Sequence, residues 1–179
     1  PQFEKERRVE DLLGLARMYL TAGMGAETLG FLRLAAMEMP QMLSTPEFIA
    51  MRGAAKILDY KSISGFLDLN NEDLQKFEDI GYWKSFALAD IGDWQQAAEY
   101  LPRQLLVLET YPRQIRNRLT IALAEVALRA GDQDKARDYY LTNVMVNSAA
   151  QLFQQASLNQ MCLIKSPTLL SSLSSIGSS

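Results

Sequence analysis

Apolar residues recur at helical spacing along most of the chain, and the strict alternation of a half-buried strand is absent. Near the start, residues three and four positions apart form one apolar helix face, namely Leu12, Leu15, Ala16 and Tyr19. This pattern predicts a helix over 4–22 that Gly23 ends, because glycine adopts the left-handed C′ conformation without strain. A second pattern predicts a helix over 26–38, which Pro40 prevents from continuing.

Capping and breaking residues divide the rest of the chain into further helices. Thr45 can cap a helix with Pro46 at its first position, and Asp93 can cap another, with Gln96 completing a capping box. Pro102 should kink or split the helix that follows Asp93. The remaining helices are expected at 61–69, from 70 or 71 to 91, at 113–130, from 132 onward and at 148–165. The serine-rich tail 166–179 is expected to be weakly helical or disordered.

Turn signals recur at nearly constant intervals. Gly23, Leu58 and Gly92 are 35 and 34 residues apart, and Gly131 follows after another 39. A period near 34 built from two helices resembles the tetratricopeptide repeat. In the first unit, the residues that match the family's motif are Leu12, Leu15, Ala16, Tyr19, Gly23, Leu32, Ala35 and Pro40, whereas Thr28 departs from the expected alanine. The resemblance covers about residues 9–145.

The resemblance implies an all-α, right-handed α-solenoid of about four antiparallel helical hairpins, with a C-terminal capping helix or helices. The repeat domain would span 1–165, with units at 9–42, 44–76, 78–111 and 117–147 and a capping helix at 148–165. Stacked hairpins share one continuous core, in which small residues let helices approach and aromatic residues fill the space between repeats. The residues expected in these core roles are Ala16, Ala54, Ala97, Tyr19, Trp94 and Tyr140.

The composition excludes several classes of function. Apolar residues make up 48% of the 179 residues, and the net charge of −3 gives no signal for nucleic acid or an anionic membrane. No apolar run reaches the roughly 20 residues that cross a bilayer, so no membrane insertion is expected. Because residue 1 is proline, we expect a segment of a longer, bacterial protein, cytoplasmic by default and periplasmic if that protein carries a signal or anchor.

Catalytic chemistry is not indicated by the residue types. The chain has no histidine, which removes the commonest general base and metal ligand, and Cys162 is the only cysteine. Cys162 stands among apolar residues, as a buried hydrophobe would. We therefore expect no enzyme activity, no metal and no cofactor. The arginines Arg103, Arg113, Arg116 and Arg118 are interpreted as a solvated basic face rather than a nucleic-acid site.

The resemblance also implies a binding face, because the first helix of each pair lines the concave surface of such solenoids. The family's register places Leu13, Phe48, Tyr82 and Ile121 in one row of this groove. A second row holds Arg17, Arg52, Phe86 and Glu125, flanked by Lys56, Arg118 and Arg129. The expected function is a scaffold that binds a peptide or helix of a protein partner. The alternative is a structural or assembly segment whose groove is filled by its own chain or by a homo-oligomer partner.

Overall fold

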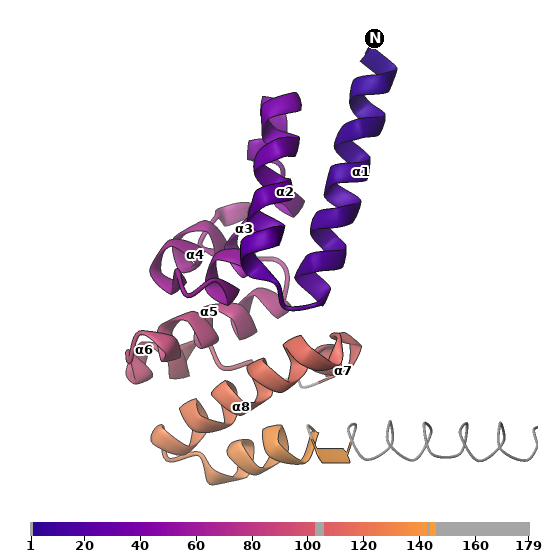
Figure 1. Cartoon of the computed structure of the whole chain (residues 1–179). Coiled ribbons are helices and arrows are strands. Elements are labelled where there is room, and N and C mark those ends of the chain that lie inside the picture. Colours follow the sequence, from indigo (N-terminus) through magenta and orange to yellow (C-terminus); the bar gives the residue numbers. More distant parts are fainter. Residues whose placement is uncertain (1, 103–105, 143, 146–179) are drawn as a thin grey trace, which may run out of the picture. The chain divides into compact units, whose positions relative to one another are not determined.

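The computed structural model describes residues 2–102, 106–142 and 144–145 (Figure 1). The chain divides into two compact units, 1–143 and 144–179, and every helix named in Figure 1 belongs to the first. Regular structure in the described residues is entirely helical, which confirms the prediction of an all-α fold. The predicted helix 148–165 and the tail 166–179 lie outside the described residues.

The described helices follow one another with short connections. The α-helices are α1 (Gln2–Thr21), α2 (Gly25–Glu38), α3 (Pro46–Leu58), α4 (Ser62–Leu69), α5 (Asp79–Asp90), α6 (Trp94–Glu99), α7 (Leu106–Thr110) and α8 (Arg113–Arg129). Two 3₁₀ helices, η1 (Pro40–Ser44) and η2 (Glu72–Leu74), lie before α3 and α5, and a further helix starts at 133 and is described to 142.

Two predicted helix starts are confirmed by their capping contacts. The Asp93 carboxylate accepts the backbone N–H of Gln96 at 3.1 Å, and Asp132 caps the next helix in the same way. The prediction for Thr45 is wrong, because its hydroxyl donates to the Met42 carbonyl at 2.9 Å and does not cap α3. Pro46, whose ring fixes a helical φ and needs no N–H partner, still begins this helix.

The helix predicted from 70 or 71 to 91 is interrupted. The Asn71 side chain accepts the backbone N–H of Asp73 at 2.9 Å, a local bond that competes with helix formation. The Gln75 side chain then donates to the carbonyls of Leu69 and Asn71, where a continuing helix would have supplied backbone donors. The chain resumes as α5 only at Asp79. The split expected at Pro102 is confirmed, since α6 ends at Glu99 and α7 begins at 106.

Four helices end in the same hydrogen-bonded turn, in which one residue has positive φ and the next N–H reaches back five positions. The left-handed residues are Gly23, Tyr60, Gly92 and Gly131, with φ of 76°, 60°, 83° and 82°. The returning bonds run from Met24 to Tyr19, Lys61 to Lys56, Asp93 to Leu88 and Asp132 to Ala127, at 2.8–3.0 Å. These are Schellman motifs. The second turn is therefore centred on Tyr60, two residues after the Leu58 expected from the period.

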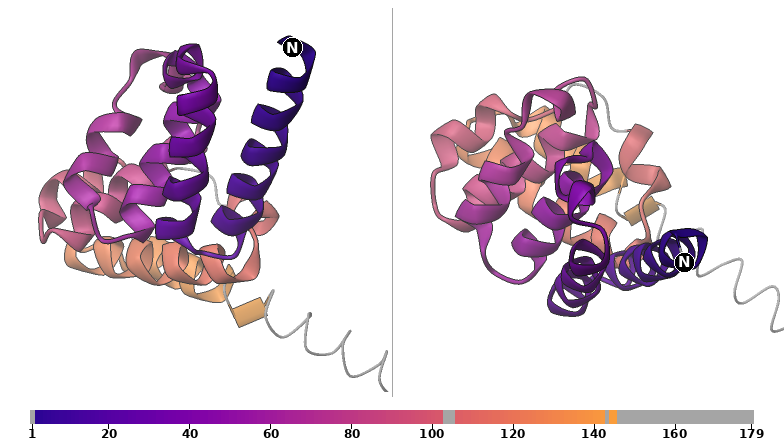
Figure 2. Two further views of the ribbon diagram at one scale, coloured as in Figure 1. Left: turned by 45° about the horizontal axis from the view of Figure 1, so that its top comes forward. Right: turned by 90° about the horizontal axis from the view of Figure 1, so that it is seen from above.

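Helices adjacent in sequence pack against each other. The pairs α1–α2, α3–α4 and α5–α6 each make extensive contact, and α2 and α4 each pack on the next pair (Figure 2). The first members also contact one another in order, α1 with α3, α3 with α5 and α5 with α8. The α3–α4 contact is very close, because a Cβ at Gly65 would lie 2.6 Å from the Gly53 carbonyl oxygen.

The predicted core residues are borne out only in part. Ala16, Ala54 and Ala97 are buried, as expected for close helix contacts. Tyr140 is 63% exposed, so its predicted core role is wrong, and the residue before it, Tyr139, is fully buried in its place. Adjacent tyrosines on one helix point in different directions, and the sequence pattern does not distinguish them.

Candidate functional site

The first row of predicted groove residues is mostly buried. Leu13, Phe48 and Tyr82 are 2%, 2% and 1% exposed, so the expectation that they face an open groove is wrong. Only Ile121, at 62%, is exposed. In α1 the buried face runs through Val9, Leu13 and Ala16, so Leu13 faces the core together with the predicted Ala16.

The charged residues of the predicted site are held by intramolecular ion pairs. Arg17 donates to Glu10 and Glu47 at 2.8 Å each, and these hydrogen bonds raise the pKa of Arg17. Arg129 pairs with Glu125 at 2.8 Å and lies 4.0 Å from the centre of the Trp94 ring. These contacts satisfy the guanidinium groups that were expected to meet a partner.

Arg52 and Lys56 converge on one carboxylate. The carboxylate of Asp68 in α4 accepts two hydrogen bonds from Arg52 at 2.9 Å each, and it forms an ion pair with Lys56 at 2.7 Å. Burial acts to raise the pKa of Asp68, but the hydrogen bonds and charges of Arg52 and Lys56 outweigh it and lower that pKa. Arg118 lies over the ring of Phe86 at 5.9 Å. The predicted residues thus form separate groups with partners of their own.

An apolar pocket of about 190 Å³ lies between α1, α3, α5 and α8, the four helices that end in Schellman motifs. The sequence did not predict this pocket. Its lining comes from α1 (Leu20, Thr21), α3 (Ala50, Met51, Ala54), the end of α4 (Leu69), α5 (Asp79, Ile80, Trp83) and the start of α8 with the turn before it (Tyr111, Pro112, Ile115). Helix packing thus brings together residues that are far apart in the sequence, from Leu20 to Ile115. We call this site the apolar pocket.

One edge of the apolar pocket is polar and fixed. The indole N–H of Trp83 donates to the hydroxyl of Tyr111 at 3.1 Å, and that hydroxyl donates to Asp79 at 2.9 Å. Burial, together with the neighbouring charge of Asp79, raises the pKa of Tyr111, so its hydroxyl keeps its proton at neutral pH. A pocket with apolar walls and a few placed polar groups is the usual form of a binding site.

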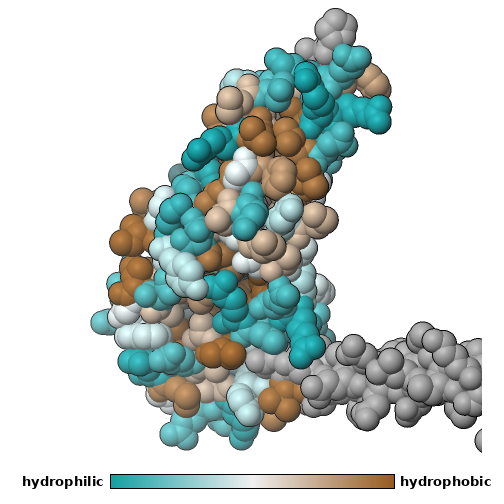
Figure 3. Space-filling model, viewed as in Figure 1, coloured by the Kyte–Doolittle hydropathy of each residue, from teal (hydrophilic) through white to brown (hydrophobic). Residues whose placement is uncertain are grey.

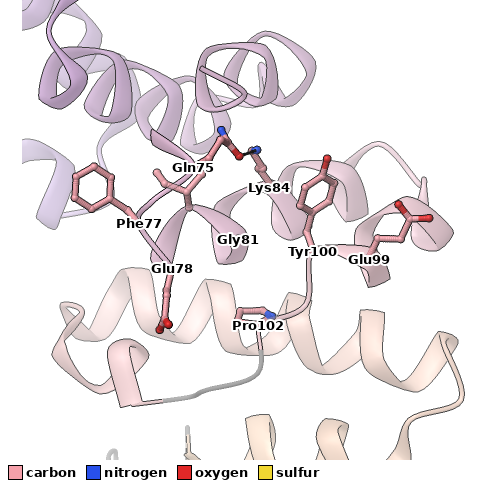
Figure 4. Close-up of a pocket in the computed structure, with 9 residues that line it drawn as sticks. Gln75, Phe77, Glu78, Gly81, Lys84, Glu99, Tyr100 and Pro102 are labelled. Carbon is pink, nitrogen blue, oxygen red and sulfur yellow. Dashed lines mark hydrogen bonds between the residues drawn. The ribbon is translucent and has the colours of Figure 1, made fainter. Parts of the chain in front are cut away.

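A second, polar pocket of about 530 Å³ shares one lining residue, Ile80, with the apolar pocket. Figure 4 shows the side chains around this second pocket. It is lined by Gln75, Phe77, Glu78, Ile80, Gly81, Lys84, Glu99, Tyr100 and Pro102. Lys84 is only 2% exposed, and burial lowers the pKa of its ammonium group. We call this site the polar pocket.

The surface offers no single dominant apolar face in the view of Figure 3, where hydrophobic side chains lie in several patches separated by hydrophilic ones. Within the described residues, acidic residues form no group with the geometry of a metal site. None of the described helices is long and apolar enough to span a membrane. Comparison with protein-family models, curated proteins and solved structures found no match.

Proposed function

We propose that this chain is a tetratricopeptide-like helical-repeat scaffold, a right-handed stack of antiparallel helical hairpins that binds a segment of a protein partner without catalysis. Two observations support the repeat. Helices pack in consecutive pairs, and α1, α3, α5 and α8 end in the same turn at spacings of 37, 32 and 39 residues. Stacked helical pairs expose the long concave surfaces that repeat proteins use for binding.

The apolar pocket carries the proposal for binding. At about 190 Å³ it is smaller than the roughly 300–1,000 Å³ of small-molecule sites. It suits one large apolar side chain of a peptide or helix. Such a buried anchor in a well-packed pocket is the usual hot spot of an interface, worth about 2 kcal/mol or more.

The surface next to the pocket can extend the contact. A shallower hollow of about 630 Å³ shares Thr21 and Pro112 with the apolar pocket and adds the exposed side chain of Met18. The Tyr111 hydroxyl and Asp79 carboxylate could orient polar groups of the bound segment at the pocket edge. A segment would thus meet one deep anchor site and a broader flanking surface.

The proposal can be tested with a substitution that fills the apolar pocket with a larger side chain. Ala50 is half-buried and lines it, so Ala50→Leu places new atoms where the anchor side chain would go. Ala26→Leu is the matched control, because Ala26 is exposed and lies outside both pockets. A library of displayed twelve-residue peptides would be selected for binding to the 179-residue chain. The affinities of the selected peptides would then be measured by fluorescence anisotropy.

We expect selected peptides to share a large apolar residue and to bind Ala50→Leu at least tenfold more weakly, with Ala26→Leu unchanged. Peptides without such a residue, or with equal affinity for Ala50→Leu, would refute the proposal. Light scattering distinguishes the assembly alternative, in which a second copy fills the pocket. In that case the wild type is a dimer and Ala50→Leu is a monomer.

A further inference from the structure

The buried ammonium group of Lys84 has only neutral acceptors. Its Nζ donates to the side-chain oxygen of Gln75 at 2.6 Å and to that of Asn70 at 3.2 Å, and it lies 5.1 Å from the centre of the Tyr100 ring. In the described part of the chain, no carboxylate forms an ion pair with it. An ammonium group has three N–H donors, so the third has only the face of the ring.

The Gln75 side chain is held in the orientation that serves Lys84. Its Nε2 donates to the carbonyls of Leu69 and Asn71 at 3.1 and 2.7 Å, which leaves the amide oxygen to accept from Lys84. The amide cannot be reversed, because carbonyl oxygens only accept and an ammonium group only donates. The positive charge is therefore held at a fixed point of the polar pocket. Figure 4 shows the bond between Gln75 and Lys84.

Burial of this charge without a counter-ion is costly, since a buried cation normally has an acidic partner. The two acidic residues that line the pocket do not supply one. Glu78 and Glu99 are exposed, and their carboxylates point away from Lys84 in Figure 4. The other walls are aromatic or aliphatic, from Phe77, Tyr100 and Pro102.

We infer that the polar pocket binds an organic carboxylate, with the Lys84 ammonium as its charge partner. The third N–H of Lys84 would donate to the ligand, and the aromatic and proline walls would contact its apolar part. One buried cation, with two glutamates at the rim, matches a single negative charge better than a phosphate dianion. The inference concerns a different pocket from the proposed peptide anchor and does not depend on it.

The carboxylate could belong to a free organic acid or to an acidic side chain of a bound peptide. Phenylacetate represents the first source and N-acetyl-Phe-Glu-Phe-amide the second. Phenylacetamide is the neutral isostere of phenylacetate. Each is titrated into the full chain, wild type or variant, and its affinity is measured from the changes in the probe's own ¹H NMR signals. In the wild type with ¹³C-labelled lysine, the Lys84 Cε signal is followed as well.

We expect saturable binding of at least one carboxylate, with a dissociation constant of about 1 mM as is usual for a ligand of this size. Phenylacetamide and the Lys84→Met variant should each show binding at least tenfold weaker. Lys5→Met is the control, because Lys5 is an exposed lysine outside both pockets whose loss changes the net charge equally. Its affinity should equal that of the wild type.

A second readout uses the wild type alone, in case Lys84→Met does not fold. A bound carboxylate stabilises the charged ammonium, so it should raise the pKa of Lys84, whereas phenylacetamide should not. Three outcomes would overturn the inference. The first is equal affinity for the acid and the amide, and the second is equal affinity of Lys84→Met and the wild type for the acid. The third is that neither carboxylate saturates the chain at about 50 mM, which is 50-fold above the expected dissociation constant of about 1 mM. Saturation by one probe only would identify the source of the carboxylate.

Discussion

Replacing Asp68 by asparagine should destabilise the contact between α3 and α4. The carboxylate accepts two bonds from Arg52 and one from Lys56, and its side chain is 13% exposed. Asparagine keeps the shape but leaves two cations without their counter-ion. Exposed pairs contribute about 0–1 kcal/mol, and breaking a fully buried pair costs about 3–5 kcal/mol. The intermediate burial of this group indicates a loss of about 2 kcal/mol.

The assays are urea unfolding, which gives the free energy, and thermal unfolding, which gives Tm, both followed by far-ultraviolet circular dichroism at pH 7. A loss of about 2 kcal/mol corresponds to a fall of about 4–8 °C in Tm for a chain of this length. Asp134→Asn is the control, because Asp134 pairs with Arg137 at 3.1 Å on the open surface and its loss should cost less than about 0.5 kcal/mol. Equal effects of Asp68→Asn and Asp134→Asn would refute the reasoning.

The pH dependence gives a second check. The folded-state pKa of Asp68 lies below the ordinary aspartate value of 3.8. Between those two pKa values the unfolded chain binds more protons, so stability rises with pH there. The contribution of Asp68 is therefore fully present above about pH 5 and is lost as pH falls through the lowered pKa. The difference between wild type and Asp68→Asn should shrink as the pH falls below 3.8. A constant difference down to about pH 2 would contradict this.

Three further substitutions test other parts of the structure by urea unfolding. Gly30→Ala should stabilise by about 0.5–1 kcal/mol, because Gly30 is inside α2 and an added Cβ would meet no atom within 4 Å; no gain would contradict this. Tyr60→Gly should be more stable than Tyr60→Ala by about 1 kcal/mol, because position 60 has φ of 60°; the reverse order would show that the turn adapts. Lys84→Met should stabilise by about 1 kcal/mol at pH 7, with the gain decreasing as pH rises towards 10.5, because the lowered pKa lets the wild-type lysine lose its proton more readily when folded. A gain that does not change with pH would show that the charge is not the cause.

The boundaries of the helices were largely predictable because the signals are local. Proline, glycine and capping aspartates act within a few residues of themselves, and so Gly23, Pro46 and Asp93 located helix ends correctly. The faces of the helices were less predictable. In α1, Leu12, Leu13 and Leu15 are the same residue type, and only contact with α2 and α3 decides that Leu13 is buried.

The candidate sites were harder to predict than the helices. Leu20, Ala50 and Ile115 line one pocket although they come from three helices, and a single sequence carries no signal for such proximity. A signal for Lys84 was present. It stands in α5 within "IGYWKSFALA", which is apolar around most of the helix, so no exposed side was available to this lysine. A charged residue in such a segment indicates burial and a specific environment.

The pairwise packing of neighbouring helices has a consequence for how the chain folds. Most contacts join elements that follow each other in sequence, and even the link from α5 to α8 closes a short stretch of chain. Contacts of this kind need little loop closure, so folding should be fast, in the microsecond to millisecond range of helical proteins. Each pair can also open without the whole chain unfolding. Amide hydrogen exchange should therefore be slowest in α3 and α5, which have neighbours on both sides, and faster in α1 and α2 at the end of the row.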